Sequence, residues 1–190
     1  MLADWNPGSV KKPWPRSWRS AHGFLRFRPP YRLGEARAAY LLLDLWPIVH
    51  ITEEVYEEAV AFGQPLGAPD ALTIRLFWQK HNLPIIAVSD NVLTAYQPAI
   101  KLDPGERATL AYALTLKDVL VLVDDEDARN EARRLRLPVR GTIGVLVDSY
   151  RRALLTLAEI ELLFNEISAR PDIWISANLC NRVLQMLRSE

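Results

Sequence analysis

The stretch Val119-Leu120-Val121-Leu122-Val123-Asp124-Asp125-Glu126-Asp127 decides the fold of this chain. It opens with a continuous apolar run that lacks the polar alternation of a half-exposed strand, which predicts a strand covered on both faces in a parallel sheet. The run ends in acidic residues. Ligands of open parallel sheets gather beyond the carboxyl ends of the strands, so Asp124 and Asp125 stand where acids can do chemistry. The structural alternative for either aspartate is capping of the next helix.

Helices and short strands are expected to alternate on both sides of this run. Upstream, we expect helices over residues 33–46, 53–62, 70–81 and 104–116, and strands over 48–51 and 83–88. Downstream, we expect a helix over 127–136, a short strand over 138–140, a turn over 141–144, and helices over 145–154, 156–169 and 176–188. Strands separated by helices predict right-handed crossover connections and an α/β fold class.

Length and composition exclude several classes of protein. The 190 residues fit one domain of ordinary size, or one domain with a tail. The apolar share of 49% and the charged share of 24% are those of a folded globular chain. No apolar stretch is long enough for a membrane helix, and the N-terminus lacks the pattern of an export signal. Because Cys180 is the single cysteine, the sequence shows no mark of an oxidising compartment, and we expect a cytoplasmic location.

The first 40 residues are strongly basic. They carry eight Lys and Arg residues against Asp4 and Glu35, and they also hold three tryptophans and five prolines. Many prolines disfavour helices and strands, so we expect no regular structure before about Tyr31 and divide the chain into a basic leader, 1–32, and a folded domain, 33–190. Interleaved Arg and Trp could bind nucleic acid, whereas a poorly ordered leader or a mis-assigned start is the alternative. The leader residues predicted to contact nucleic acid are Lys11, Lys12, Arg16 and Arg19.

The acidic residues suggest a particular metal chemistry. Paired carboxylates with no His or Cys partner nearby suit an oxygen-preferring cation such as Mg²⁺ or Mn²⁺, and such a cation indicates phosphoester chemistry. Asp103-Pro104-Gly105-Glu106 forms a capping box, which gives Glu106 a structural explanation as well. Glu58, in a helix interior, would ordinarily be a charge on the solvent face.

Several stretches together resemble one known family. They are Leu43-Asp44-Leu45-Trp46, Ile51-Thr52-Glu53-Glu54-Val55-Tyr56-Glu57-Glu58, Leu102-Asp103-Pro104-Gly105-Glu106, Val121-Leu122-Val123-Asp124-Asp125-Glu126-Asp127-Ala128-Arg129 and Leu137-Pro138-Val139-Arg140-Gly141-Thr142-Ile143-Gly144-Val145-Leu146. From about Leu41 to Leu187 the order of these motifs resembles the PIN-domain family of metal-dependent ribonucleases, in particular its VapC-like branch. The resemblance implies a three-layer fold in which a short central parallel sheet is flanked by helices.

The resemblance also assigns roles to residues. It implies that Glu58, Glu106 and one of Asp124 or Asp125 are the catalytic acids and hold Mg²⁺ or Mn²⁺ in one pocket, and it does not choose between the two aspartates. It further implies that Arg129 and Thr142 contact nucleic acid.

One family feature is missing. The family opens with a strand that ends in an aspartate followed by a small or hydroxyl residue. Counting back from Val55 leads to His22-Gly23-Phe24-Leu25, where no acid stands. One of four metal-site acids is therefore absent, and a site that loses a carboxylate binds its cation more weakly.

Two functions follow as expectations. The first is a divalent-metal-dependent endoribonuclease of the PIN type, the toxin of a toxin–antitoxin pair, in which a metal-bound water attacks the phosphodiester. The second is a non-catalytic module of the same fold that binds nucleic acid or an antitoxin, which the missing aspartate favours. The expected partners are RNA, a cognate antitoxin protein and a second copy of the chain.

Overall fold

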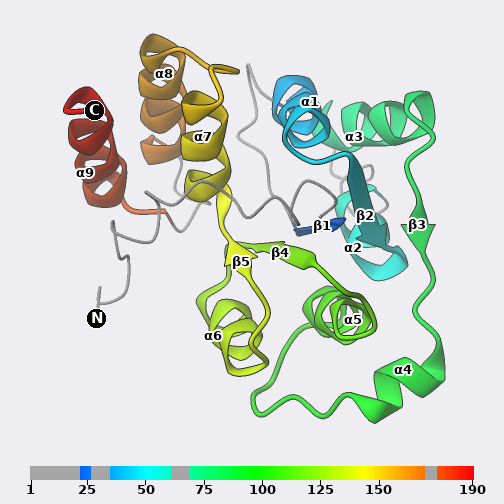
Figure 1. Cartoon of the computed structure of the whole chain (residues 1–190). Coiled ribbons are helices and arrows are strands. Elements are labelled where there is room, and N and C mark those ends of the chain that lie inside the picture. The colour runs from blue at the N-terminus through cyan, green and yellow to red at the C-terminus, as the bar shows by residue number, and fades with distance from the viewer. Residues whose placement is uncertain (1–21, 27–34, 61–68, 170–174) are drawn as a thin grey trace.

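The computed structural model describes residues 22–26, 35–60, 69–169 and 175–190. The described strands form one parallel sheet in the order β3-β2-β1-β4-β5. The strands are β1 (His22–Arg26), β2 (Ile48–Thr52), β3 (Ile85–Ile86), β4 (Val119–Val123) and β5 (Val139–Arg140). The helices are α1 (Glu35–Leu45), α2 (Glu53–Val60), α3 (Pro69–Lys80), α4 (Asp90–Ala95), α5 (Pro104–Ala113), α6 (Glu126–Arg134), α7 (Thr142–Arg151), α8 (Leu157–Ser168) and α9 (Ala177–Arg188). Helices flank the sheet, as Figure 1 shows, and the predicted α/β class with a short central parallel sheet is confirmed.

Strand β4 is buried along its whole length, as its apolar run predicts. Leu120 and Leu122 pack into one cluster with residues of α1, α3 and α7. Val119, Val121 and Val123 pack into another with residues of α5 and α6. Because successive side chains of a strand point to opposite faces, a strand covered on both sides must be apolar at every position.

The position of β1 shows that one expectation from the sequence was wrong. Regular structure was not expected before about Tyr31, yet β1 lies in the middle of the sheet, between β2 and β4. Its register pairs Phe24 with His50 of β2 and Arg26 with Val123 of β4. The prediction failed because the prolines that argued against structure stand on both sides of residues 22–26 and not within them.

Other differences are smaller. Helix α7 begins at Thr142 and not at residue 145, because the predicted turn supplies its first residues and Gly141 is its N-cap. Strand β3 covers two residues of the six expected, and the short helix α4 was not predicted. The capping box of α5 is confirmed, and a second one opens α8, where Thr156 and Glu159 exchange hydrogen bonds.

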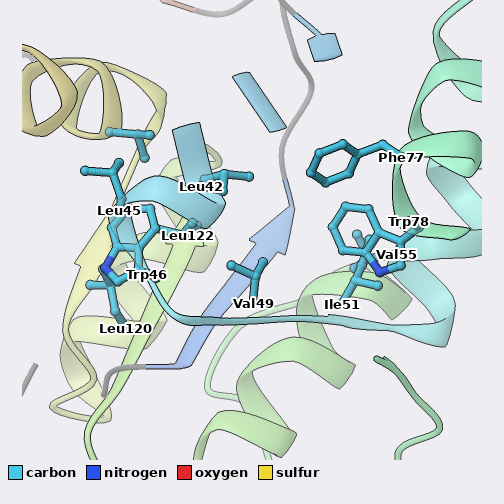
Figure 2. Packing of buried hydrophobic residues seen from close by; sticks show 11 residues of the cluster. Leu42, Leu45, Trp46, Val49, Ile51, Val55, Phe77, Trp78, Leu120 and Leu122 are labelled. Atoms are coloured by element: carbon cyan, nitrogen blue, oxygen red, sulfur yellow. The ribbon is translucent and has the colours of Figure 1, made fainter. Parts of the chain in front are cut away.

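Two tryptophans anchor the core on the α1 side of the sheet. In Figure 2, Trp46 lies beside Leu120 and Leu122, while Trp78 lies beside Val55. Trp46 is 1% exposed and Trp78 is 4% exposed. Burial of such large side chains is a main favourable term in folding. A separate cluster joins α7, α8 and α9 through Phe164, Ile160 and Val183.

No helix in the described ranges is long and apolar enough to span a membrane.

Candidate functional site

The first predicted site element is the N-terminus of α5. The Asp103 carboxylate accepts a hydrogen bond from the Glu106 amide at 2.8 Å, and the Glu106 carboxylate accepts one from the Asp103 amide at 3.2 Å. Glu106 is 6% exposed. This exchange satisfies two amides at the start of the helix, where the helix dipole also favours negative charge. Glu106 therefore has the helix-capping role that the sequence predicted as its structural explanation.

Glu58 reaches the same place from α2. Its Oε2 atom lies 3.3 Å from the point where a Cβ atom on Gly105 would stand, and Asp103 Oδ1 lies 3.6 Å from that point. Val55 Cγ2 lies only 2.9 Å from it, so the contact between the two helices requires glycine at position 105. The fold thus brings the carboxylates of Glu58 and Asp103 to the residue that precedes Glu106.

The second site element is the carboxyl end of β4. Asp124 Oδ1 accepts a hydrogen bond from the Thr142 amide at 2.8 Å, and Oδ2 accepts one from the Thr142 hydroxyl. Thr142 is the first residue of α7 and is buried. A Cβ atom on Gly141 would stand 2.7 Å from Asp124 Oδ1, so this contact also depends on glycine. Asp124 therefore ties the end of β4 to the start of α7.

Three effects act on the pKa of Asp124. Asp124 is exposed as a residue, but the protein atoms packed around its carboxyl group raise the pKa, while the hydrogen bonds from Thr142 and the positive charge of Arg129 lower it. Arg129 also lies beside Gly141, with Nη1 3.8 Å from the same Cβ point. An arginine and a threonine are therefore the partners of this carboxylate.

The two aspartates after β4 have different surroundings. Asp125 is the N-cap of α6, and its side chain accepts a hydrogen bond from the Ala128 amide at 2.9 Å. Helix capping, the structural alternative that the sequence allows for either aspartate, is confirmed for Asp125. Asp124 remains as the aspartate that faces Thr142 and Arg129.

Within the described ranges, no three or more His, Cys, Asp or Glu side chains form a group that could hold a metal ion. The register also places Arg26, and no acid, at the end of β1 opposite Val123. Mg²⁺ is bound by carboxylates close enough to share it, and the oxygens of Asp124 already serve Thr142. The common pocket predicted for Glu58, Glu106 and the aspartates stays a prediction.

Four predicted nucleic-acid contacts, Lys11, Lys12, Arg16 and Arg19, lie outside the described residues. Arg129 and Thr142 lie together at Asp124, as described above. The sequence interpretation did not single out Arg133 or Arg140, which also lie near Arg129. The spacing of Arg129 and Arg133, four residues apart on one helix, is a signal that could have identified Arg133.

The acidic network of α6 was not predicted either. Glu131 is 2% exposed, and its carboxylate accepts hydrogen bonds from the Tyr96 hydroxyl at 3.1 Å and the Ala99 amide at 3.1 Å. Arg134 adds two more at 2.8 Å. These bonds tie the segment before α5 to α6. No local motif marks them, because the partners are more than 30 residues apart in the sequence.

Comparison with known proteins gives one match. A family model, DUF3368, described as a PIN domain, matches residues 31–189. No curated protein and no solved structure matches this chain.

Proposed function

Because this chain belongs to the PIN-domain family, whose modules are of the nuclease type, we propose that it is an RNA-binding module that keeps the nuclease fold and binds RNA without a resident divalent metal. The family model covers all of the described helices and four of the five strands, since only β1 lies before its first residue. Nucleic-acid binding is the activity that this family suggests at a coarse level. That RNA binding needs no resident metal is the part of the proposal that goes beyond what the family suggests.

The observation that carries the proposal is the pairing of Asp124. Its hydrogen-bond donors are the Thr142 amide and hydroxyl, and the Arg129 guanidinium acts on its charge. A cationic side chain beside a carboxylate stabilises its negative charge, as a bound metal cation would.

The residues of this chain have definite tasks in the proposed function. Asp124 holds the start of α7 against β4, so that Gly141 and Thr142 lie at a fixed place on the carboxyl edge of the sheet. The N-terminus of α7 carries the positive end of the helix dipole. Arg129 adds a full positive charge next to it. A phosphate group is favoured by both charges.

The experiment measures RNA binding and RNA cleavage on the same samples of the full chain. A labelled single-stranded RNA is titrated with protein, once in EDTA and once in Mn²⁺, and the RNA is afterwards resolved on a denaturing gel. We expect equal affinity in both conditions and intact RNA. Glu106→Gln is the matched variant, because glutamine keeps the capping box and removes only the charge. It should behave as the wild type does.

A second candidate function is favoured by the neighbourhood of Gly105. Glu58 and Asp103 meet at the residue before Glu106, which places acids from two elements close together. In this candidate, Glu58, Glu106 and Asp124 or Asp125 hold Mg²⁺ or Mn²⁺, and the chain is an endoribonuclease, the toxin partner of an antitoxin, in the cytoplasm. A second copy of the chain would be a further partner. RNA cleavage that requires Mn²⁺ and is lost in Glu106→Gln would establish this candidate and refute the first.

A further inference from the structure

We propose that Arg129, Arg133 and Arg140 form one binding face for the phosphate groups of a single RNA strand, which we name the arginine face. The inference rests on the proposed function and adds the surface and the part of the RNA that it contacts. Arg129 and Arg133 lie on α6, and Arg140 is the last residue of β5, two residues before the start of α7. In Figure 1, β5 connects the region of α6 to α7.

The geometry brings the three side chains to one place. Arg129 and Arg133 are four residues apart, so they project from the same side of α6. Arg129 Nη1 lies 3.8 Å from the Cβ point of Gly141, and Arg140 Cδ lies 2.8 Å from the Cβ point of Gly144. The two glycines thus allow Arg129 and Arg140 to lie against the first turn of α7. The N-cap of α7, Gly141, has no side chain to cap this end of the helix.

The electrostatics of the face favour an anion. Burial lowers the pKa of Arg129, and the positive charges of Arg133 and Arg140 lower it further, whereas Asp124 and Glu126 act in the opposite direction. The guanidinium groups of Arg133 and Arg140 therefore each lie close enough to Arg129 to repel it. A phosphate bound between them would relieve that repulsion and would gain charge-assisted hydrogen bonds.

Two acids near the arginine face, Asp124 and Asp148, already accept hydrogen bonds. Both oxygens of Asp124 accept hydrogen bonds from Thr142. The Nε atom of Arg129 is buried and has no hydrogen-bond partner, so Asp124 does not hold this guanidinium through Nε in a two-bond pair. Asp148 pairs with Arg140 at 3.3 Å through Nε, which fixes the stem of that side chain.

Arg133 is the most accessible member of the face. It is exposed, and its Nη1 donates a hydrogen bond to Asn130 at 2.8 Å, which orients the guanidinium without placing a negative charge beside it. Three cations, two on one helix and one at a strand end, fit an RNA strand with several phosphates better than they fit one small anion. The planar fork of arginine suits phosphate oxygens in particular.

The test is a salt series of RNA binding in EDTA, with a labelled oligouridylate and the full chain. Arg133→Ala is the main variant because the side chain is exposed, and Arg129→Ala is the second. Each lost phosphate contact should make the slope of log affinity against log salt shallower by about 0.7 and should lower affinity about fivefold at 0.1 M salt. The matched control is Arg75→Ala, which removes the same charge from an exposed position on α3. Thermal unfolding of each variant checks the fold.

The outcomes separate this inference from the proposed function. If the wild type binds and both arginine-face variants keep its affinity and salt slope, or if Arg75→Ala loses as much, the arginine face is wrong and RNA binding stands. If the wild type binds no RNA, both proposals fail. Added inorganic phosphate should weaken RNA binding only as much as its contribution to the ionic strength predicts. Displacement of the RNA at far lower phosphate concentration would show a site for one small anion and would overturn the inference. Arg133→Lys should retain most of the salt slope, since it keeps the charge.

Discussion

Glu131 offers the sharpest test of how the segment before α5 is held. Its carboxylate accepts hydrogen bonds from Tyr96, Ala99 and Arg134. The hydrogen bond from Arg134 is the largest of several effects that bring the pKa of Glu131 down from 4.5 to about 2 against the opposing effect of burial. This difference corresponds to about 3 kcal/mol in favour of the folded state. Because the Arg134 side chain is 50% exposed and water screens the pair, we expect about 2 kcal/mol.

The change to make is Glu131→Gln, which keeps the shape of the side chain and removes its charge. The free energy of unfolding from urea titrations should fall by about 2 kcal/mol at pH 7, where the wild-type carboxylate is ionised. The folded-state pKa is the lower one, so the contribution of Glu131 is complete above about pH 4.5 and is lost as the pH falls toward about 2. The difference between wild type and variant should therefore shrink steadily over this range.

The control is Asp118→Asn. Asp118 is exposed and has a φ of 54°, a conformation that asparagine also adopts, so its loss of charge should change stability by less than about 0.5 kcal/mol. A Glu131→Gln variant as stable as the wild type at pH 7 would refute the reasoning. A loss of stability that is the same at pH 7 and pH 3 would refute the electrostatic part of it.

Four further substitutions test the two ends of the candidate site. Gly141→Ala should destabilise by about 1–3 kcal/mol in urea unfolding, because its Cβ would stand 2.7 Å from Asp124 Oδ1. Gly144→Ala should cost less, since its Cβ would meet Arg140 Cδ at 2.8 Å and alanine favours the helix by about 1 kcal/mol, which offsets part of the crowding. An equal loss at both glycines would contradict the contact with Asp124. Asp103→Ala should cost about 1 kcal/mol through loss of the N-cap, whereas Glu106→Gln should change stability by less than about 0.5 kcal/mol. A larger loss in Glu106→Gln than in Asp103→Ala, measured by the same titration, would show that the charge of Glu106 has a further structural role.

The sequence predicts much of the fold because the signals are local. An apolar run without alternation identifies β4, and the acid, proline and glutamate at positions 103, 104 and 106 identify the start of α5. Strand β1 is not predictable in this way. Its five residues include a glycine, a histidine and an arginine, and their strand conformation depends on pairing with β2 and β4, which come later in the chain.

The candidate site is predictable only in part, for a similar reason. The sequence identifies Asp124 and Asp125 as a pair, but which one caps α6 depends on the geometry at the end of β4. That Gly141 permits the contact between Asp124 and Thr142 depends on how close α7 approaches β4. Such distances are set by tertiary packing, and a residue pattern does not contain them.

The measurement that tests the central claim most directly is the equilibrium affinity of the full chain for a labelled single-stranded RNA, first in EDTA and then after addition of excess Mn²⁺, followed by a gel of the same RNA. The account predicts one affinity in both conditions, a steep dependence on salt, and uncut RNA. Binding or cleavage that appears only with Mn²⁺, and that disappears in Glu58→Gln and Glu106→Gln, would contradict it and would make this chain a metal-dependent ribonuclease.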